Sequence, residues 1–308
     1  MEMVAGAFRP SSKSAEAGGR CELVLHPMPR AADCSVADLP LEWAFYAETM
    51  NSIWESVARS PHPSGYLDPL VARQKREAHL QLVRRWLRGL NPQSVLKTDL
   101  FEEAFGEDRV LFDLAPGAKQ AVGIDIAVGT IAAARRHCPA AGFSFLASDV
   151  RALALRTGSF ELVFSNSTLD HFETRAELLA ALRELVRVVR PSGLLAITLD
   201  NPWNPLYPLL RRATRMRHAP YVLGCTASRR QLNAWLRDLG MEVVENEWLI
   251  HNPRLLSTGL FLGLRKVMGH AADGPIRILL RLFELLGRLP TAPFTACFLA
   301  VCARKPAP

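Results

Sequence analysis

Acidic and amide side chains stand at the ends of four short apolar runs in this chain. They are Asp99, Asp125, Asp149 and Asn166. Carboxylate and amide oxygens accept hydrogen bonds. A row of such acceptors suits a ligand that carries a ribose diol and an adenine, provided that the fold brings the four residues together.

The apolar runs have the character of buried strands in a parallel sheet, because they are short and do not alternate with polar residues. We expect strands at residues 94–99, 121–125, 143–149, 160–166 and 194–199. The stretches between them can hold crossover helices, which predicts a βαβ arrangement. Ligands of such sheets bind beyond the carboxyl ends of the strands, where the polar residues lie.

Four segments, taken in order, resemble the class I S-adenosylmethionine-dependent methyltransferases that act on small molecules. The segments are residues 122–126, 147–150, 160–172 and 185–195. The last is similar to the helix, the turn and the fifth strand of that family, here with Pro191-Ser192-Gly193 in the turn. The resemblance implies an α/β, Rossmann-like, doubly wound fold with a mostly parallel seven-stranded sheet, an N-terminal helical lid and a helical cap insertion.

The resemblance also implies S-adenosyl-L-methionine as the cofactor. The residues expected to bind it beyond the first loop are Asp125 and Ile126, Asp149 and Val150, and Asn166 and Ser167. Asp125 would accept hydrogen bonds from both ribose hydroxyls, and Asp149 from the adenine amino group. The alternative for either carboxylate is a solvated cap of the helix that follows.

The first loop departs from the family pattern, which has several glycines after strand one. Here the segment begins Lys97-Thr98-Asp99, and its first glycine is Gly106. A turn without glycine does not easily take a positive φ, so Thr98 or Asp99 could be the N-cap of the next helix. Two interpretations follow. Either the side chains of Lys97, Thr98 and Asp99 contact the cofactor's amino and carboxylate groups, or cofactor binding is weakened or lost.

His171 and Asp170 follow the fourth strand and are the candidates for catalysis. An imidazole titrates near neutral pH and is suited to take a proton from an acceptor, with Asp170 orienting it. The alternative is that His171 caps the next helix or packs on Phe172. His251 is a second candidate base.

The chain divides into three expected parts. Residues 1–40 have the composition of a disordered arm, residues 41–93 would form the helical lid, and residues 94–308 the methyltransferase domain, with cap insertions at about 201–227 and 252–292. We expect helices at 41–59, 70–90, 129–137, 174–190, 228–239, 255–268 and 275–289, a crossover at 102–118, and strands at 241–245 and 294–302, the last antiparallel at the edge.

Composition limits the class of protein. The chain has 308 residues, 49% of them hydrophobic, and a net charge of +7. No apolar run approaches the eighteen or so residues of a spanning helix, and no N-terminal stretch resembles a signal peptide. The six cysteines lack the spacing of zinc ligands, so we expect no metal. The expected compartment is a reducing cytoplasm.

The basic and apolar segments of the chain indicate which substrate or macromolecule it could bind. The cluster Arg211–Arg217 could clamp a phosphate or carboxylate of the substrate, or it could be a solvated helix face. The apolar helices within residues 255–289 could be lid core, a homodimer interface or a membrane-surface contact. Aromatic residues are 8% of the chain and do not interleave with the basic runs, so nucleic acid is not expected.

The expected function is transfer of a methyl group from S-adenosylmethionine to a small-molecule acceptor, anionic or amphiphilic in character. We expect O-methylation in secondary or lipid-like metabolism. The alternative is a methyltransferase-like binding protein without catalysis. A third interpretation is a nicotinamide-dependent oxidoreductase, against which the missing G-x-G-x-x-G after strand one counts.

Overall fold

The computed structural model describes residues 53–60, 65, 67–138, 142–216 and 221–307. These residues belong to one compact unit, residues 39–308. The predicted arm over residues 1–40, and residues 41–52 of the predicted first helix, lie outside the described residues.

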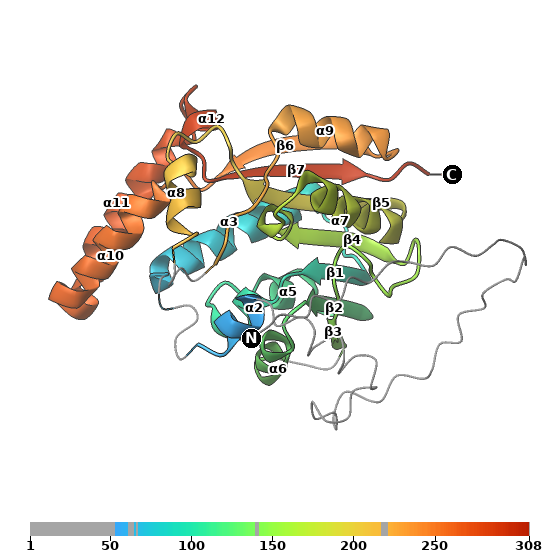
Figure 1. Ribbon diagram of the computed structural model, residues 1–308, viewed down its shortest axis with the longest axis horizontal. Helices are drawn as coiled ribbons and strands as arrows, with labels where there is room; N and C mark the ends of the chain where they lie inside the picture. Colours follow the sequence, from blue (N-terminus) through green and yellow to red (C-terminus); the bar gives the residue numbers. More distant parts are fainter. Residues whose placement is uncertain (1–52, 61–64, 66, 139–141, 217–220, 308) are drawn as a thin grey trace, which may run out of the picture. The chain divides into compact units, whose positions relative to one another are not determined.

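A seven-stranded sheet forms the centre of this unit (Figure 1). Its strands are β1 (Ser94–Thr98), β2 (Gln120–Asp125), β3 (Phe143–Ala147), β4 (Phe160–Asn166), β5 (Val189–Asp200), β6 (Glu242–Leu249) and β7 (Phe298–Arg304). Their order is β3-β2-β1-β4-β5-β7-β6, and β7 runs antiparallel to both of its neighbours. The predicted α/β sheet is therefore confirmed, but β7 lies between β5 and β6, and not at the edge.

The predicted helices are present over the described residues, and the first crossover holds two short helices. Two further helices were not predicted: Tyr207–Ala213, and Ala292–Thr295, which includes the first two residues of the strand predicted at 294–302. The described helices are α2 (Ile53–Ala58), α3 (Pro69–Leu87), α4 (Phe101–Phe105), α5 (Val110–Leu114), α6 (Val128–Arg136), α7 (Arg175–Val188), α8 (Tyr207–Ala213), α9 (Arg229–Asp238), α10 (Arg254–Met268), α11 (Asp273–Leu286) and α12 (Ala292–Thr295). Thr174 and Ser228 form capping boxes that set the starts of α7 and α9.

Helices cover both faces of the sheet. Buried side chains of α3, α5 and α6 pack on one face, and those of α7 and α9 on the other (Figure 1). Neighbouring strand residues divide between the two layers: Leu162 belongs to the first cluster and Val163 to the second. Burial on both faces explains why the parallel strands read as continuous apolar runs.

Helix α3 is part of the core and not a separate lid. Val83, Trp86 and Leu87 are buried against the sheet. Only the first turns of α3 reach the ligand-binding side, where Val71 and Lys75 line a cavity. The expectation of a helical lid over residues 41–93 is therefore corrected for this helix, because its C-terminal half is fixed in the main core.

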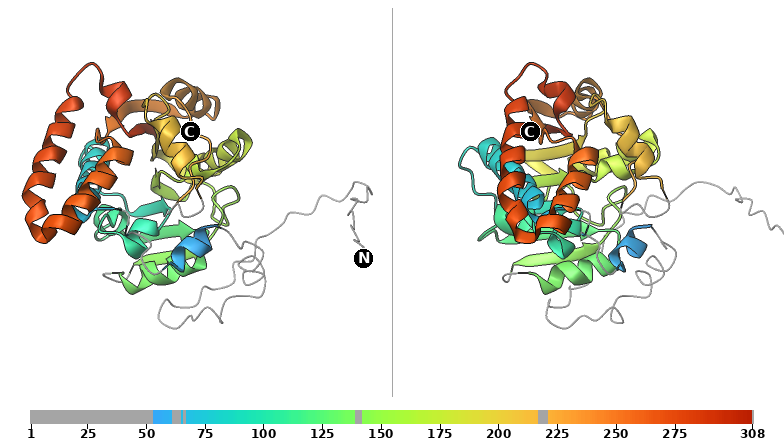
Figure 2. Two further views of the ribbon diagram at one scale, coloured as in Figure 1. Left: turned by 60° about the vertical axis from the view of Figure 1, so that its left-hand side comes forward. Right: turned by 90° about the vertical axis from the view of Figure 1, so that its left-hand side faces the viewer.

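Helices α10 and α11 stand side by side at one end of the sheet, joined by a 3₁₀ turn at Gly269–Ala272 (Figure 2). They form the predicted insertion between β6 and β7. Phe261, Ile276 and Leu280 pack with Leu70 and Val71 of α3 in a third, smaller cluster. Among the described residues, no helix is both long and apolar enough to cross a membrane.

Candidate active site

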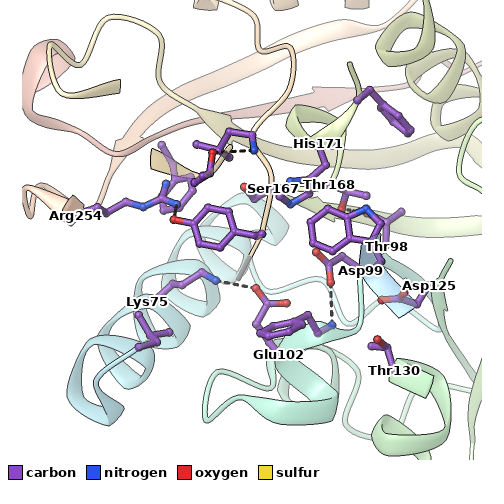
Figure 3. A pocket seen from close by; sticks show the side chains of 18 of the residues that line it. Lys75, Thr98, Asp99, Glu102, Asp125, Thr130, Ser167, Thr168, His171 and Arg254 are labelled. Atoms are coloured by element: carbon purple, nitrogen blue, oxygen red, sulfur yellow. Dashed lines mark hydrogen bonds and ion pairs between the residues drawn. The ribbon is translucent and has the colours of Figure 1, made fainter. Parts of the chain in front are cut away.

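A cavity of about 390 Å³ lies at the carboxyl ends of β1 to β4 (Figure 3). The strand-end residues that line it are Thr98, Asp99, Asp125, Ile126, Asp149, Val150 and Ser167. Its other walls come from α2, α3, α8 and α10. The topology thus brings together seven of the nine side chains that the sequence assigned to a cofactor site.

Asp125 ends β2 at the floor of this cavity. Its Oδ2 accepts from the backbone N–H of Leu100 at 2.9 Å, and its Oδ1 from that of Ala127 at 2.8 Å. Each carboxylate oxygen keeps a second acceptor site, so the group can still receive two hydroxyl donors. Burial raises the pKa of Asp125 to about 6, and donors from a diol would stabilise its charged form.

Asp149 is held by a cation. Arg151 Nη2 lies 2.6 Å from Asp149 Oδ2, and Arg151 Nε donates to both carboxylate oxygens at 3.0 Å. The same guanidinium lies 5.2 Å from the ring centre of Phe172. The backbone of Val150 remains beside this pair at the cavity wall. Asp149 is therefore fixed in place, with part of its acceptor capacity used by Arg151.

The glycine-poor first loop takes a positive φ without glycine, because Asp99 adopts φ 64°. Aspartate tolerates this left-handed conformation better than most residues. The N-cap of α4 is Leu100, and not Thr98 or Asp99, although Asp99 Oδ1 still accepts from Phe101 N at 2.8 Å. Gly123 lies opposite this loop, and a Cβ there would come 2.5 Å from Cδ2 of Leu100, so the Leu100 side chain would have to shift.

Lys97 and Asn166 lie behind the cavity wall, so their predicted cofactor contacts are corrected. Lys97 is fully buried, with its Nζ 2.9 Å from Glu103 and 3.4 Å from Glu102. Burial alone would lower the pKa of Lys97, but Glu103 and Glu102 raise it. Asn166 donates to Glu102 at 3.1 Å and accepts from Thr198 at 2.9 Å. Both side chains hold Glu102 and the strand ends in position.

Glu102 and Lys75 were not expected at the site, yet both line the cavity. Lys75 Nζ lies 2.7 Å from Glu102 Oε1 and 3.1 Å from Asp108 Oδ2. Burial would raise the pKa of Glu102, but Lys75 and Lys97 lower it to about 2, so this carboxylate stays charged. The only signal in the sequence was the unusual pair of acids in the first loop, because Lys75 is one of several cations on α3.

His171 lines the cavity beside Trp54, with the two ring centres 4.6 Å apart. Its Nδ1 lies 2.7 Å from the carbonyl oxygen of Val222. A carbonyl only accepts, so in the neutral ring Nδ1 carries the proton and Nε2 is the proton acceptor. His251 is buried against Thr295, with Nδ1 2.9 Å from Oγ1.

Asp170 does not orient His171, contrary to the prediction. Its Oδ2 accepts from Ser167 Oγ at 2.9 Å and from Asp200 N at 2.6 Å. Asp170 is fully buried and therefore fixes the loop after β4 to β5. The residue that orients the imidazole is Val222, through its backbone, and side-chain types in the sequence carry no sign of such a contact.

The cavity fits a nucleoside cofactor with a charged tail. Asp125 has two open acceptor sites at the floor, Asp149 and Val150 lie next to it, and Lys75 and Glu102 place opposite charges at another part of the wall. Within the described residues, no group of three histidine, cysteine or acidic side chains could hold a metal ion.

The strand order, with antiparallel β7 inserted between β5 and β6, and the ligand cavity at the strand ends define the class I methyltransferase fold. Residues 102–197 match the family model described as a methyltransferase domain. The chain thus contains a methyltransferase domain, of the class whose methyl donor is S-adenosylmethionine.

The chain is similar to solved structures of other proteins. The N-methyltransferase NodS from Bradyrhizobium japonicum WM9, in complex with S-adenosyl-L-homocysteine, is 17% identical, with a TM-score of 0.51 over 85% of this chain and 98% of that one. A possible histamine N-methyltransferase from Thermotoga maritima is 15% identical, with a TM-score of 0.48 over 77% of this chain and 92% of that one. No curated protein matches the sequence.

Proposed function

We propose that the protein transfers the methyl group of S-adenosylmethionine to an oxygen atom of a small, largely apolar acceptor. The observation that carries the proposal is the position of His171. Its Nε2 is left as a proton acceptor in the same cavity that holds Asp125 and Asp149. The proposed nucleoside-binding floor and the base therefore line one cavity.

The adenosine part of the cofactor would lie on the ends of β2 and β3. Asp125 would accept from the ribose hydroxyls there and Asp149 from the adenine amino group. Ile126 and Val150 line the cavity beside them. When bound, S-adenosylmethionine supplies an electrophilic methyl group. The chain's own contribution is to orient the two reactants and exclude water.

Lys75 and Glu102 would hold the amino-acid end of the cofactor. They form a partly buried ion pair at the cavity wall, and Lys75 lies on the side of Glu102 away from Asp125 in Figure 3. A zwitterion is complementary to such a pair, because its carboxylate can face the ammonium and its ammonium the carboxylate. This pair would replace the glycine-rich loop, with Thr98 and Asp99 beside it.

The acceptor would occupy the part of the cavity next to α8 and α10. This wall is largely apolar and includes Leu210, Leu223, Leu255 and Phe298. Arg254 supplies a cation there, in an ion pair with the buried Asp200 and 3.1 Å from the Tyr221 hydroxyl. An amphiphilic hydroxyl compound of lipid-like or secondary metabolism suits this surface, and His171 would take the hydroxyl proton.

Calorimetric titration tests the cofactor half of the proposal. We expect S-adenosylmethionine and S-adenosylhomocysteine to bind, and NAD not to bind. Binding of NAD alone would refute the proposal in favour of an oxidoreductase.

A screen of hydroxyl acceptors with purified protein tests the chemistry. His171→Gln should lower kcat about a hundredfold and leave the dissociation constant of S-adenosylhomocysteine unchanged. Cofactor binding without transfer to any hydroxyl, amine or carbon acceptor would favour a binding protein. Equal kcat values for the two proteins would exclude His171 as the base.

A further inference from the structure

Helices α10 and α11 use only their inner faces for packing. Phe261, Ile276 and Leu280 are buried, with exposures of 1%, 0% and 6%. Large apolar side chains on the outer faces are exposed: Leu256 63%, Leu260 47%, Val267 85%, Ile278 60%, Leu282 53%, Leu285 48% and Leu289 49%. Surfaces of this kind in a folded protein mark a place where something apolar binds.

The exposed side chains of α11 and its C-terminal extension form a stripe. Ile278, Leu282 and Leu285 recur at helical spacing, so they share one side of the helix, and the exposed Leu289 follows in the turn after it. Arg277, Arg281 and Arg288 are exposed along one border of this stripe, together with one acid, Glu284. Arg277 lies 3.8 Å from Asp273. An apolar stripe bordered by cations is the pattern of a helix that lies in a membrane interface.

The apolar surface of α10 begins at the cavity wall. Leu255 and Thr258 line the cavity, and Leu255 is 38% exposed to solvent next to Leu256. The two helices lie side by side toward the viewer in the right-hand panel of Figure 2. Whatever covers their outer faces therefore lies close to the acceptor end of the cavity.

We propose that the outer faces of α10 and α11 rest on an anionic membrane surface. Leucine and isoleucine side chains would enter the interface, while Lys266 and the three arginines would contact lipid phosphates and carboxylates. Binding to an anionic surface agrees with the net positive charge of the whole chain, +7. A further consequence, which rests on the proposed methyl transfer, is that the acceptor itself is lipid-borne and reaches the cavity past Leu255.

Charge favours a membrane over a second copy of the chain. A two-fold dimer would bring the same patch of both copies together. The three arginines on that border of α11 outnumber its one exposed acid, Glu284, so most charge contacts across the two-fold axis would join like charges, which oppose association. An anionic lipid surface instead supplies opposite charge to every one of them.

Co-sedimentation of the full chain with vesicles tests the inference. We expect binding to phosphatidylcholine vesicles that contain phosphatidylserine, weakening with added salt, and much weaker binding to pure phosphatidylcholine. Leu282→Asp combined with Leu285→Asp should reduce the bound fraction at least about tenfold. Leu90→Asp is the control, because Leu90 is also an exposed leucine, at 65%, and does not belong to these helices.

Two further variants separate charge from apolar contact. Arg281→Glu combined with Arg288→Glu should abolish the preference for phosphatidylserine, whereas Arg183→Glu on exposed α7 surface should not. All variants should bind S-adenosylhomocysteine as the parent does, which shows that they fold and keeps this inference separate from the proposed function.

Three results would overturn the inference. One is no sedimentation with either vesicle while the protein still binds S-adenosylhomocysteine. Another is vesicle binding that the α11 variants do not change. The third is a homodimer, seen by light scattering, that Leu282→Asp dissociates, because the face would then be an interface between copies of the chain.

Discussion

The raised pKa of one residue, Asp125, makes the stability of the folded chain depend on pH. Its pKa in the folded chain is about 6, against roughly 3.9 in an unfolded chain. The folded state therefore holds this proton more tightly. The stabilisation from protonation is fully present below about pH 4 and is lost as the pH rises through 6.

Urea unfolding of the parent and of Asp125→Asn at pH 5 and pH 7 measures this effect. The asparagine side chain does not titrate, so the difference in unfolding free energy between the two proteins isolates Asp125. We expect the parent to gain about 1 kcal/mol relative to the variant on going from pH 7 to pH 5. A difference that stays constant between the two pH values would contradict the raised pKa.

Lys75 should discriminate between ligands by their amino-acid end. Lys75→Met removes one partner of the zwitterion and leaves Glu102 beside Lys97. We expect S-adenosylhomocysteine to bind at least about tenfold more weakly, and 5′-methylthioadenosine, which lacks the amino and carboxylate groups, to bind equally well. Calorimetry of both ligands checks this, with exposed Lys119→Met as the control. An equal loss for both ligands would mean that Lys75 only supports the fold.

At the scale of elements, the close contact between the loop after β4 and the segment before α9 fixes the position of His171. Gly224 N donates to Asp170 O at 2.8 Å, and a Cβ on Gly224 would overlap the backbone oxygen of Phe172. Gly224→Ala must push these segments apart, at a cost of about 1–3 kcal/mol.

Activity should fall in Gly224→Ala because His171 and Val222 separate, while S-adenosylhomocysteine binding at the distant Asp125 remains. Thermal denaturation and calorimetry measure the two effects. Gly274→Ala is the control, since nothing lies within 4 Å of an added Cβ there. An active, stable Gly224→Ala protein would show that the two segments can shift without consequence.

The elements themselves were largely predictable, and their side-chain roles were less so. Strands buried on both faces can be recognised in the sequence as continuous apolar runs. The starts of helices can be recognised from capping residues such as Thr174. No such signal distinguishes Lys97, which points into the core, from Lys75, which points into the cavity. That distinction depends on tertiary packing. The backbone carbonyl that orients His171 is invisible to any argument from residue types.

For the molecule as a whole, the third cluster is a separate region of stability. Leu280 packs with Phe261, Ile276 and the start of α3, away from the two clusters of the sheet. Leu280→Ala should cost about 2–4 kcal/mol in this region. Hydrogen exchange should accelerate in α10, α11 and the first turns of α3, and remain unchanged in β1 and β4. Faster exchange throughout the sheet would mean that the unit opens only as a whole.

The loop after β1 has a consequence for the entropy of binding. Glycine-rich loops have many conformations in the unfolded chain and keep much of that freedom until a ligand orders them. Asp99, Leu100 and Phe101 have fewer, and hydrogen bonds to Asp99 and Asp125 already hold them. We therefore expect the entropic cost of ordering this loop to be paid during folding, so that binding of a nucleoside loses less conformational entropy than it would with a glycine-rich loop.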